Sequence, residues 1–215
     1  MRGITKRAQK RKETVMSTEF ASAGLTAGQL NAIVKKLGGH DMALCFLRDE
    51  LVVKAVELLL VTIVSVTGSE KFVATEAFGE NNPDGIRFHI WDDFRNNFLG
   101  KIEEKVPAAD IAVHRLEKSS RDPAIMAELD IDPKVKKGVI KLAHFYKLIK
   151  AQANGEDGPL LVNGYANIAY VEDKKGSFWA VDALWFGADR EWSVNAYSVG
   201  NPLGWGDGRQ VISQV

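Results

Sequence analysis

The chain has few of the residues that build disulfide-linked or metal-stabilised folds. Its 215 residues include one cysteine, Cys45, so an internal disulfide and a cysteine-based zinc site are both excluded. A single thiol fits a reducing compartment, and the cytoplasm is the expected location. Because Cys45 falls in an amphipathic stretch, we expect it to be a small buried apolar group rather than a nucleophile.

The chain also lacks net charge and a long apolar run. Lys and Arg total 28 and so do Asp and Glu, which removes the global field that recruits nucleic acid or anionic membranes. The longest apolar run, from Leu51 to Val66, is short for a bilayer span and is interrupted by Lys54 and Glu57. We therefore expect a soluble protein with no membrane partner and with nucleic acid disfavoured.

Motifs for catalysis and for cofactor binding are missing. The segment Gly204-Trp205-Gly206-Asp207-Gly208 lacks the Lys-Ser/Thr ending of a phosphate-binding loop, and no Gly-x-Ser-x-Gly elbow occurs. His89 lies near Asp92 and Asp93 and could form a ligand or acid–base cluster. An edge-strand histidine followed by the acidic first turn of a helix explains the same pattern, and we favour it. We expect no metal and no cofactor, and a hydrolase is the third hypothesis.

An apolar content of 46% is enough for a real core, and the pattern of segments predicts an α+β fold. Met16 could be the biological start. We expect a basic flexible leader over 1–16, a helical hairpin over 17–57, a mixed α/β body over 58–158, and a Trp-rich antiparallel β module over 159–215.

The predicted hairpin begins at a capping box, Thr26-Ala27-Gly28-Gln29. Apolar residues at helical spacing follow, Gly38-Gly39 ends this helix, and Asp41 can cap a second one. We expect the pair to serve packing or dimerisation. The alternative function is a small nucleic-acid-associated regulator that uses this hairpin and the basic leader.

The body is expected to contain both helices and strands. Strands at Leu58–Val66 and Lys71–Phe78 are predicted to form a hairpin, and further strands are expected at Ile86–Ile90 and Ile111–Leu116. Helices are expected along Trp91, Phe94, Phe98 and Ile102, at Pro123–Leu129, and near Pro133–Ala151.

After residue 158 helical periodicity stops and tryptophan and tyrosine become frequent. Strands are expected at 167–171, 178–186, 192–199 and 209–215, and the short connections between the first three imply an antiparallel meander. In the third strand, alternation places Trp192, Val194 and Ala196 on a core face. Ser193, Asn195 and Tyr197 then share the opposite, wet face.

Aromatic side chains mixed with polar ones near the C-terminus are a good composition for a binding surface. Trp179 and Trp192 are the best candidates for the core, whereas Trp205, flanked by glycines, is the best candidate for an exposed anchor. The leading hypothesis is a non-enzymatic protein that binds a protein or a small ligand through this β face.

Two segments resemble known families. The stretch from Ala180 through Trp185 and from Trp192 to Val199, followed by Asn201-Pro202, Trp205 and Gly208-Arg209-Gln210-Val211, resembles the variable segment of target proteins of diversity-generating retroelements. The resemblance implies a C-type-lectin-like fold with Val194, Val199 and Val211 as scaffold. It also implies exposed binding positions, and with Trp205 the predicted ligand-binding residues are Leu184, Phe186, Asn195, Tyr197, Leu203, Trp205, Gly206 and Asp207. The segment Leu25 to Val53 resembles the opening of bacterial proteins whose C-terminal parts differ, which suggests a portable helical adaptor.

Overall fold

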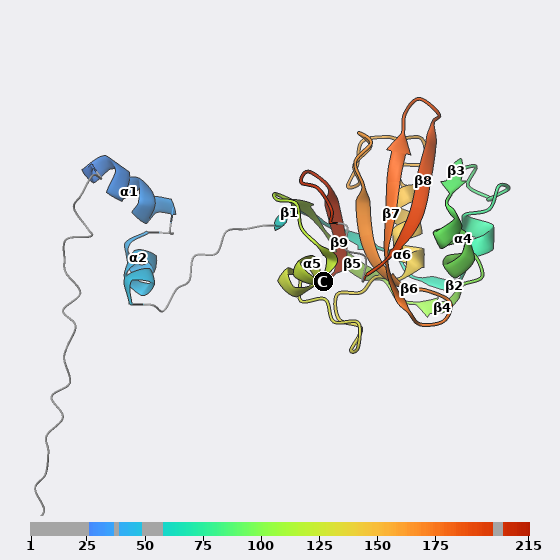
Figure 1. The fold of residues 1–215 in the computed structure, drawn as a ribbon, viewed down its shortest axis with the longest axis horizontal. Coiled ribbons are helices and arrows are strands. Elements are labelled where there is room, and N and C mark those ends of the chain that lie inside the picture. Colours follow the sequence, from blue (N-terminus) through green and yellow to red (C-terminus); the bar gives the residue numbers. More distant parts are fainter. Residues whose placement is uncertain (1–25, 37–38, 49–57, 200–203) are drawn as a thin grey trace, which may run out of the picture. The chain divides into compact units, whose positions relative to one another are not determined.

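The computed structural model describes residues 26–36, 39–48, 58–199 and 204–215, and it divides into two units, Met1–Ala55 and Val56–Val215 (Figure 1). The basic leader and Leu203 lie outside the described residues, as does the side chain of Cys45. Within the described residues no helix is long and apolar enough to cross a bilayer.

The first unit contains the two predicted helices, α1 (Ala27–Lys36) and α2 (His40–Leu47). The predicted capping box is present at the start of α1. The Thr26 amide donates to Gln29 Oε1 at 2.8 Å, and the Gln29 amide donates to Thr26 Oγ1 at 3.3 Å. Leu30 and Ile33 of the predicted apolar stripe are 43% and 44% exposed.

The second unit is built on a seven-stranded mixed sheet with the order β1-β5-β9-β6-β7-β8-β3. Strand pairs β9–β6 and β3–β8 are parallel, and the other four pairs are antiparallel. The bounds are β1 (Leu58–Val66), β3 (Phe88–Ile90), β5 (Ala109–Leu116), β6 (Asn167–Glu172), β7 (Phe178–Phe186), β8 (Glu191–Ser198) and β9 (Gln210–Gln214). A second sheet pairs β2 (Ser69–Val73) with β4 (Ile102–Val106). The described fold is therefore α+β, and the predicted meander is confirmed for β6, β7 and β8.

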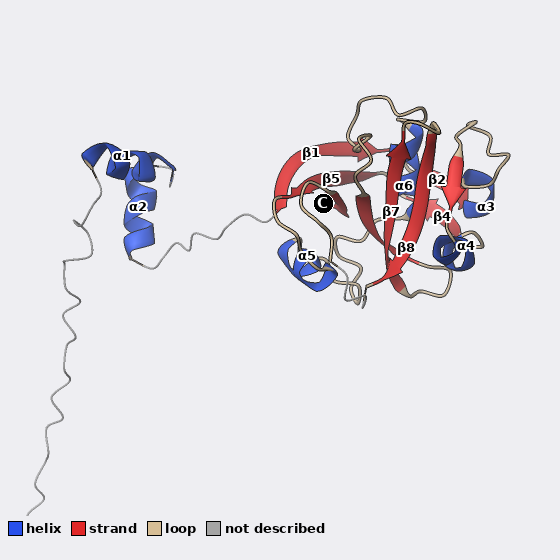
Figure 2. Cartoon of the chain, turned by 45° about the horizontal axis from the view of Figure 1, so that its top comes forward, coloured by secondary structure: helices blue, strands red, loops and turns tan. Residues whose placement is uncertain are grey.

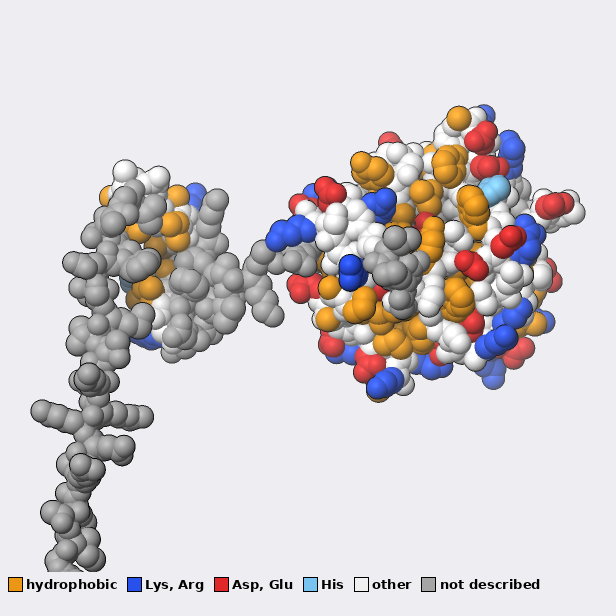
Figure 3. Space-filling view, viewed as in Figure 1, with side chains coloured by type: hydrophobic (Ala, Val, Ile, Leu, Met, Phe, Trp, Pro, Cys, Tyr) orange, Lys and Arg blue, Asp and Glu red, His pale blue; other side chains and the backbone are white. Residues whose placement is uncertain are grey.

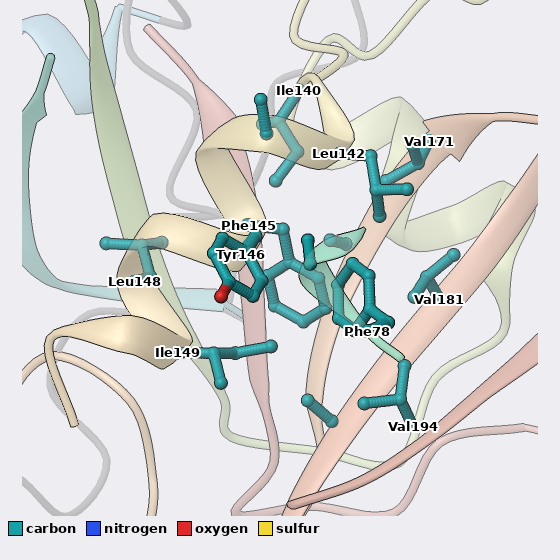
Figure 4. Close-up of a cluster of buried hydrophobic side chains, with 14 of the residues drawn as sticks. Phe78, Ile140, Leu142, Phe145, Tyr146, Leu148, Ile149, Val171, Val181 and Val194 are labelled. Atoms are coloured by element: carbon teal, nitrogen blue, oxygen red, sulfur yellow. The ribbon is translucent and has the colours of Figure 1, made fainter. Parts of the chain in front are cut away.

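One face of the large sheet is covered by α6 (Leu142–Lys150), which lies behind β7 in Figure 1. Figure 4 shows Phe145, Tyr146 and Ile149 of α6 among the side chains that meet Val181 and Val194 of the sheet. Short helices α3 (Ala74–Ala77) and α4 (Asp92–Phe98) add Ala74, Ala77, Phe94 and Phe98 to this core (Figure 2). These side chains belong to the larger of two hydrophobic cores in the second unit.

The start of α6 is set by a residue from another element. Lys141 at the N-cap makes no side-chain cap, and the buried Glu103 of β4 accepts instead from the amides of Leu142 and Ala143 at 3.2 and 2.9 Å. A carboxylate at this position satisfies free amides and complements the positive end of the helix dipole. Lys101, also buried, lies 3.3 Å from Glu103 and balances its charge.

The opposite face of the sheet carries a smaller core beneath α5 (Asp122–Glu128). Ile125 and Met126 of α5 pack there with Ile168 and Tyr170 of β6. The alternation of β6 therefore buries a side chain on each face in turn, and the strand is covered from both sides.

Four predictions about the body are wrong. The strand expected at Lys71–Phe78 ends at Val73, and Ala74–Ala77 forms helix α3 instead. The hairpin of the first two strands does not form, because β1 pairs with β5 while β2 pairs with β4. The chain changes sheets at Gly68, where a Cβ atom would lie 2.5 Å from the Val106 carbonyl oxygen. Ile102 belongs to strand β4 rather than to the preceding helix and is 56% exposed. The helix expected near Pro133 begins only at Leu142, and Val135 is 70% exposed.

The boundary expected at residue 158 does not divide the fold. Strand β9 from the C-terminal segment pairs with β5 from the body, and β3 from the body pairs with β8. Residues on both sides of the expected boundary therefore complete one sheet and share both cores.

Truncation of Ile212 tests whether this unit unfolds as one body. Ile212 is fully buried opposite Val113 of β5 and Ala169 of β6. We expect Ile212→Ala to lower the free energy of unfolding by about 2–5 kcal/mol. The control Val215→Ala removes a side chain that is 74% exposed and should change it by less than about 0.5 kcal/mol. Urea unfolding followed by tryptophan fluorescence measures both, because all five tryptophans lie in the second unit. A second fluorescence transition that Ile212→Ala leaves unchanged would contradict the single unit.

Candidate ligand-binding pocket

A pocket of about 320 Å³ lies on the sheet face opposite α6, over β7 and β8. In β7 the core residues Val181 and Ala183 alternate with Asp182 and Leu184, which point into the pocket. Figure 3 shows hydrophobic side chains gathered along these two strands on that face. The second core under α5 covers the sheet as far as Ala180 and Leu184 and leaves the pocket open.

The floor of the pocket consists of cross-strand neighbours. Asp182 of β7 lies opposite Asn195 of β8, and Leu184 lies opposite Ser193. Directly opposite side chains on one face of an antiparallel pair have Cβ atoms roughly 5 Å apart, so these four side chains form one continuous surface. The alternation predicted for β8 is confirmed, because Ser193, Asn195 and Tyr197 all line this pocket. The prediction that this face is wet holds only in part, since Ser193 is 4% exposed and the other two are partly buried.

Two indole rings in the walls are held in place by hydrogen bonds. Trp91, directly after β3, donates from Nε1 to Ser193 Oγ at 2.8 Å. Trp205 donates from Nε1 to Asp122 Oδ1 at 2.7 Å, and its ring meets the Tyr197 ring edge-on with centroids 5.5 Å apart. Phe186 completes the apolar wall and is 45% exposed.

Asp122 connects the pocket wall to the smaller core. It is 1% exposed at the start of α5, and its Oδ1 also accepts from the Tyr170 hydroxyl at 2.8 Å. Burial raises the pKa of this carboxyl, and the hydrogen bonds from Trp205 and Tyr170 oppose that rise. Its hydrogen bonds fix the position of Trp205, so Asp122 positions the wall without lining the pocket.

Asp182 is the chemically unusual group of the floor. The residue is 4% exposed, and its Oδ1 has no hydrogen-bond partner. Burial raises the pKa of Asp182 to about 7, against the opposing effects of its own backbone amide and of the charge on Arg209. Near neutral pH this carboxyl is thus divided between its neutral and ionised forms, which is common at binding and catalytic sites.

Arg209 supplies the opposite charge at the edge of the pocket. It lines the pocket together with Asp182, yet the described part of the chain shows no ion pair between them. The guanidinium lies against Gly206, where a Cβ atom would fall 2.1 Å from Nη1. A side chain at position 206 would therefore displace the Arg209 guanidinium.

The structure brings five of the eight predicted ligand-binding residues to this pocket. Leu184, Phe186, Asn195, Tyr197 and Trp205 all line it. Gly206 and Asp207 are not among the lining residues, since Gly206 contacts Arg209 and Asp207 is exposed. Leu203 lies outside the described residues.

The tryptophans are distributed differently from the prediction. Trp192 is fully buried, as predicted, and donates to the Gln152 carbonyl oxygen at 3.1 Å. Trp179 is only partly buried and donates to Asp173 Oδ2, whereas Trp185 is 6% exposed within the core. Trp205 is not a free loop anchor, because Asp122 and a backbone bridge to Ser120 hold it half-buried.

Five lining residues were missing from the predicted ligand-binding residues: Trp91, Ala166, Asp182, Ser193 and Arg209. The sequence could have indicated Asp182 as a site residue, since it is the single charged residue in the nine-residue apolar strand 178–186. Trp91 had none, because its place depends on the parallel pairing of β3 with β8.

His89 does not join this site. It is exposed, its ring contacts Trp91 with centroids 5.1 Å apart, and it is not among the lining residues. Asp92 and Asp93 are exposed in the first turn of α4. No group of three or more His, Cys, Asp or Glu side chains suited to a metal ion occurs within the described ranges.

No protein-family model, curated protein or solved structure matches this chain. The pocket is therefore interpreted from its own geometry and charge.

Replacement of Asp182 by asparagine tests the state of the buried carboxyl. The raised pKa means that Asp182 favours folding most at pH values below about 4, and that this contribution is lost as pH rises through about 7. Asp182→Asn removes the titration, so its free energy of unfolding relative to wild type should increase by roughly 2–3 kcal/mol between pH 5 and pH 8. Urea unfolding of both proteins at the two pH values measures this, and an unchanged difference would show that Asp182 is already ionised at pH 5.

Proposed function

We propose that this chain is a non-enzymatic binding protein that takes a small organic ligand into the pocket over β7 and β8. The observation that carries the proposal is a buried carboxyl on the floor with one oxygen, Asp182 Oδ1, unpartnered, below aromatic walls whose two indoles are already fixed by hydrogen bonds. Such a site loses little side-chain freedom when a ligand enters, which favours affinity.

Exposed aromatic surface supports the proposal. Trp91 and Phe186 are large apolar side chains that line the pocket, and they are 51% and 45% exposed. Aromatic groups of this kind gain contact area with a ligand at a low entropic cost. The volume of about 320 Å³ lies at the lower end of the roughly 300–1,000 Å³ typical of ligand pockets, so the ligand is small.

A binding role fits the lining better than catalysis does. Ser193 is the one aliphatic hydroxyl among the lining residues, and its Oγ accepts from Trp91 rather than facing a base. Activation of a serine requires a base within hydrogen-bond reach. The lining residues thus recognise and orient a ligand without a nucleophile–base pair.

The retroelement resemblance is kept as part of this proposal. Leu184, Phe186, Asn195 and Tyr197, which the resemblance implies to be variable positions, share one pocket, while Val194 and Val211 are fully buried. This arrangement supports a scaffold that displays exchangeable pocket residues. A near-copy of the coding segment for Trp185 to Gln210 beside a reverse transcriptase gene is the expected genomic observation.

Indole, a neutral aromatic probe, tests whether the pocket accepts a ligand. We expect titration of the ¹⁵N-labelled protein with indole to shift the Nε1–H resonances of Trp91 and Trp205, which line the pocket. The buried Trp185 and Trp192 serve as internal controls and should not shift. Equal shifts at all tryptophans, or none, would contradict a binding site at this place.

A matched pair of truncations assigns the effect to the pocket. Phe186→Ala removes an exposed wall residue and should weaken indole binding about fivefold, the effect of a lost contact worth about 1 kcal/mol. Ile102→Ala removes a comparably exposed apolar side chain on β4, outside this lining, and should leave the affinity unchanged.

A further inference from the structure

We infer that the pocket takes a free amino acid with a large apolar side chain, whose ammonium group pairs with Asp182 and whose carboxylate pairs with Arg209. This inference rests on the proposed function, because it names the class of ligand for the same pocket. Three features carry it: an unsatisfied acceptor, a charge of opposite sign that is not paired with it, and aromatic walls.

Asp182 requires a donor that the described protein does not supply. Its Oδ1 is buried and has no hydrogen-bond partner. Buried carboxyl oxygens without partners are rare, since each loses its hydration without compensation. By contrast, the other buried carboxyl beside the pocket, Asp122, receives two donors. A protonated amine offers N–H groups and a positive charge, and so satisfies Asp182 in both respects.

The charge of Arg209 indicates that the ligand is a zwitterion rather than a simple amine. Its charge acts on Asp182, although the two side chains form no ion pair. A ligand with a positive charge alone would therefore meet a guanidinium in the same pocket. A ligand with a negative charge alone would meet the buried carboxylate. A zwitterion pairs each group with its opposite and leaves no like charges together.

The remaining lining selects the side chain of the ligand. Leu184 and Phe186 from β7, with Trp91, Tyr197 and Trp205 around them, give apolar and aromatic contact on several sides. Arg209 and Asp182 are the two formally charged members of the lining, and the polar floor residues Ser193 and Asn195 are neutral. An apolar amino-acid side chain therefore loses no polar hydration when it is buried there.

The titratable and charged groups around Asp182 come from several elements. Strand β8 adds the Tyr197 hydroxyl, and Arg209 adds a positive charge before β9. Asp93 of α4 acts on Tyr197, and Asp122 lies beyond Trp205. An ammonium group binds the ionised form of Asp182, so its affinity should rise as pH increases from 6 to 8, through the pKa of about 7.

Four ligands that share an indole ring separate the charges. The probes are L-tryptophan with both charges, tryptamine with the ammonium alone, indole-3-propionate with the carboxylate alone, and indole with neither. We expect L-tryptophan to bind at least tenfold more tightly than each of the others, because each of them lacks at least one charge-assisted hydrogen bond, and one such bond is worth about tenfold in affinity. Calorimetry gives the affinities, and the Trp91 and Trp205 resonances locate each ligand.

Two charge-removing variants assign each charge to its residue. Asp182→Asn should weaken L-tryptophan about tenfold and remove the rise of its affinity with pH, while indole-3-propionate binds no more weakly than before. Arg209→Gln should weaken L-tryptophan by a similar factor and leave tryptamine unweakened. An unshifted Trp192 resonance shows that both variants keep the fold.

The outcomes separate this inference from the proposed function. If indole shifts Trp91 and Trp205 but L-tryptophan binds no more tightly than tryptamine or indole-3-propionate, the pocket is a binding site and the zwitterion is wrong. If affinity for L-tryptophan is unchanged in Asp182→Asn, the assignment of the ammonium group is wrong. If none of the four ligands shifts either resonance, the proposed function itself fails.

Discussion

The middle strand of the large sheet, β6, is buried on both faces, and this requirement organises the second unit. Ile168 and Tyr170 point to one side, and Ala169 and Val171 point to the other. A strand that is apolar on both sides must be covered twice. Helix α6 provides one cover, with its first turn held by Glu103 of the small sheet, and α5 provides the other. Neither layer could be removed without exposing half of the central strand.

The pocket exists because the two covers differ in extent. Helix α6 and its aromatic neighbours cover the inner face of β7 and β8, and Val181, Trp192 and Val194 there have no exposed surface. The layer built around α5 ends at Asp122, which holds Trp205 as its outermost side chain. Beyond that ring the outer face of the same two strands is open, and Asp182 lies under this gap. The proposed ligand pocket therefore lies where the layer around α5 ends.

Local patterns in the sequence predicted the strands well, because alternation is a property of the chain itself. The bounds of β1 and β7 and the two faces of β8 follow from residues within each strand. The partners of the strands could not be predicted in this way. The parallel pair β3–β8 brings Trp91 to the pocket over a separation of 102 residues from Ser193. Likewise, Glu103 sets the start of α6 from another element, and Asp182 reads as one more residue of an apolar strand until its neighbours are known.

Strand β9 is the last strand in sequence order, but it lies third in the large sheet, between β5 and β6. During synthesis, β5 and β6 have both left the ribosome before the strand that joins them is available, and each then has an unpaired edge. The antiparallel group β6, β7 and β8 can assemble locally, whereas closure of the sheet must wait for residues 210–214. Arg209 comes directly before those residues, so the charge that faces Asp182 arrives only with the strand that completes the sheet. A nascent chain should therefore acquire its ligand-binding pocket in the same step that makes its fold cooperative.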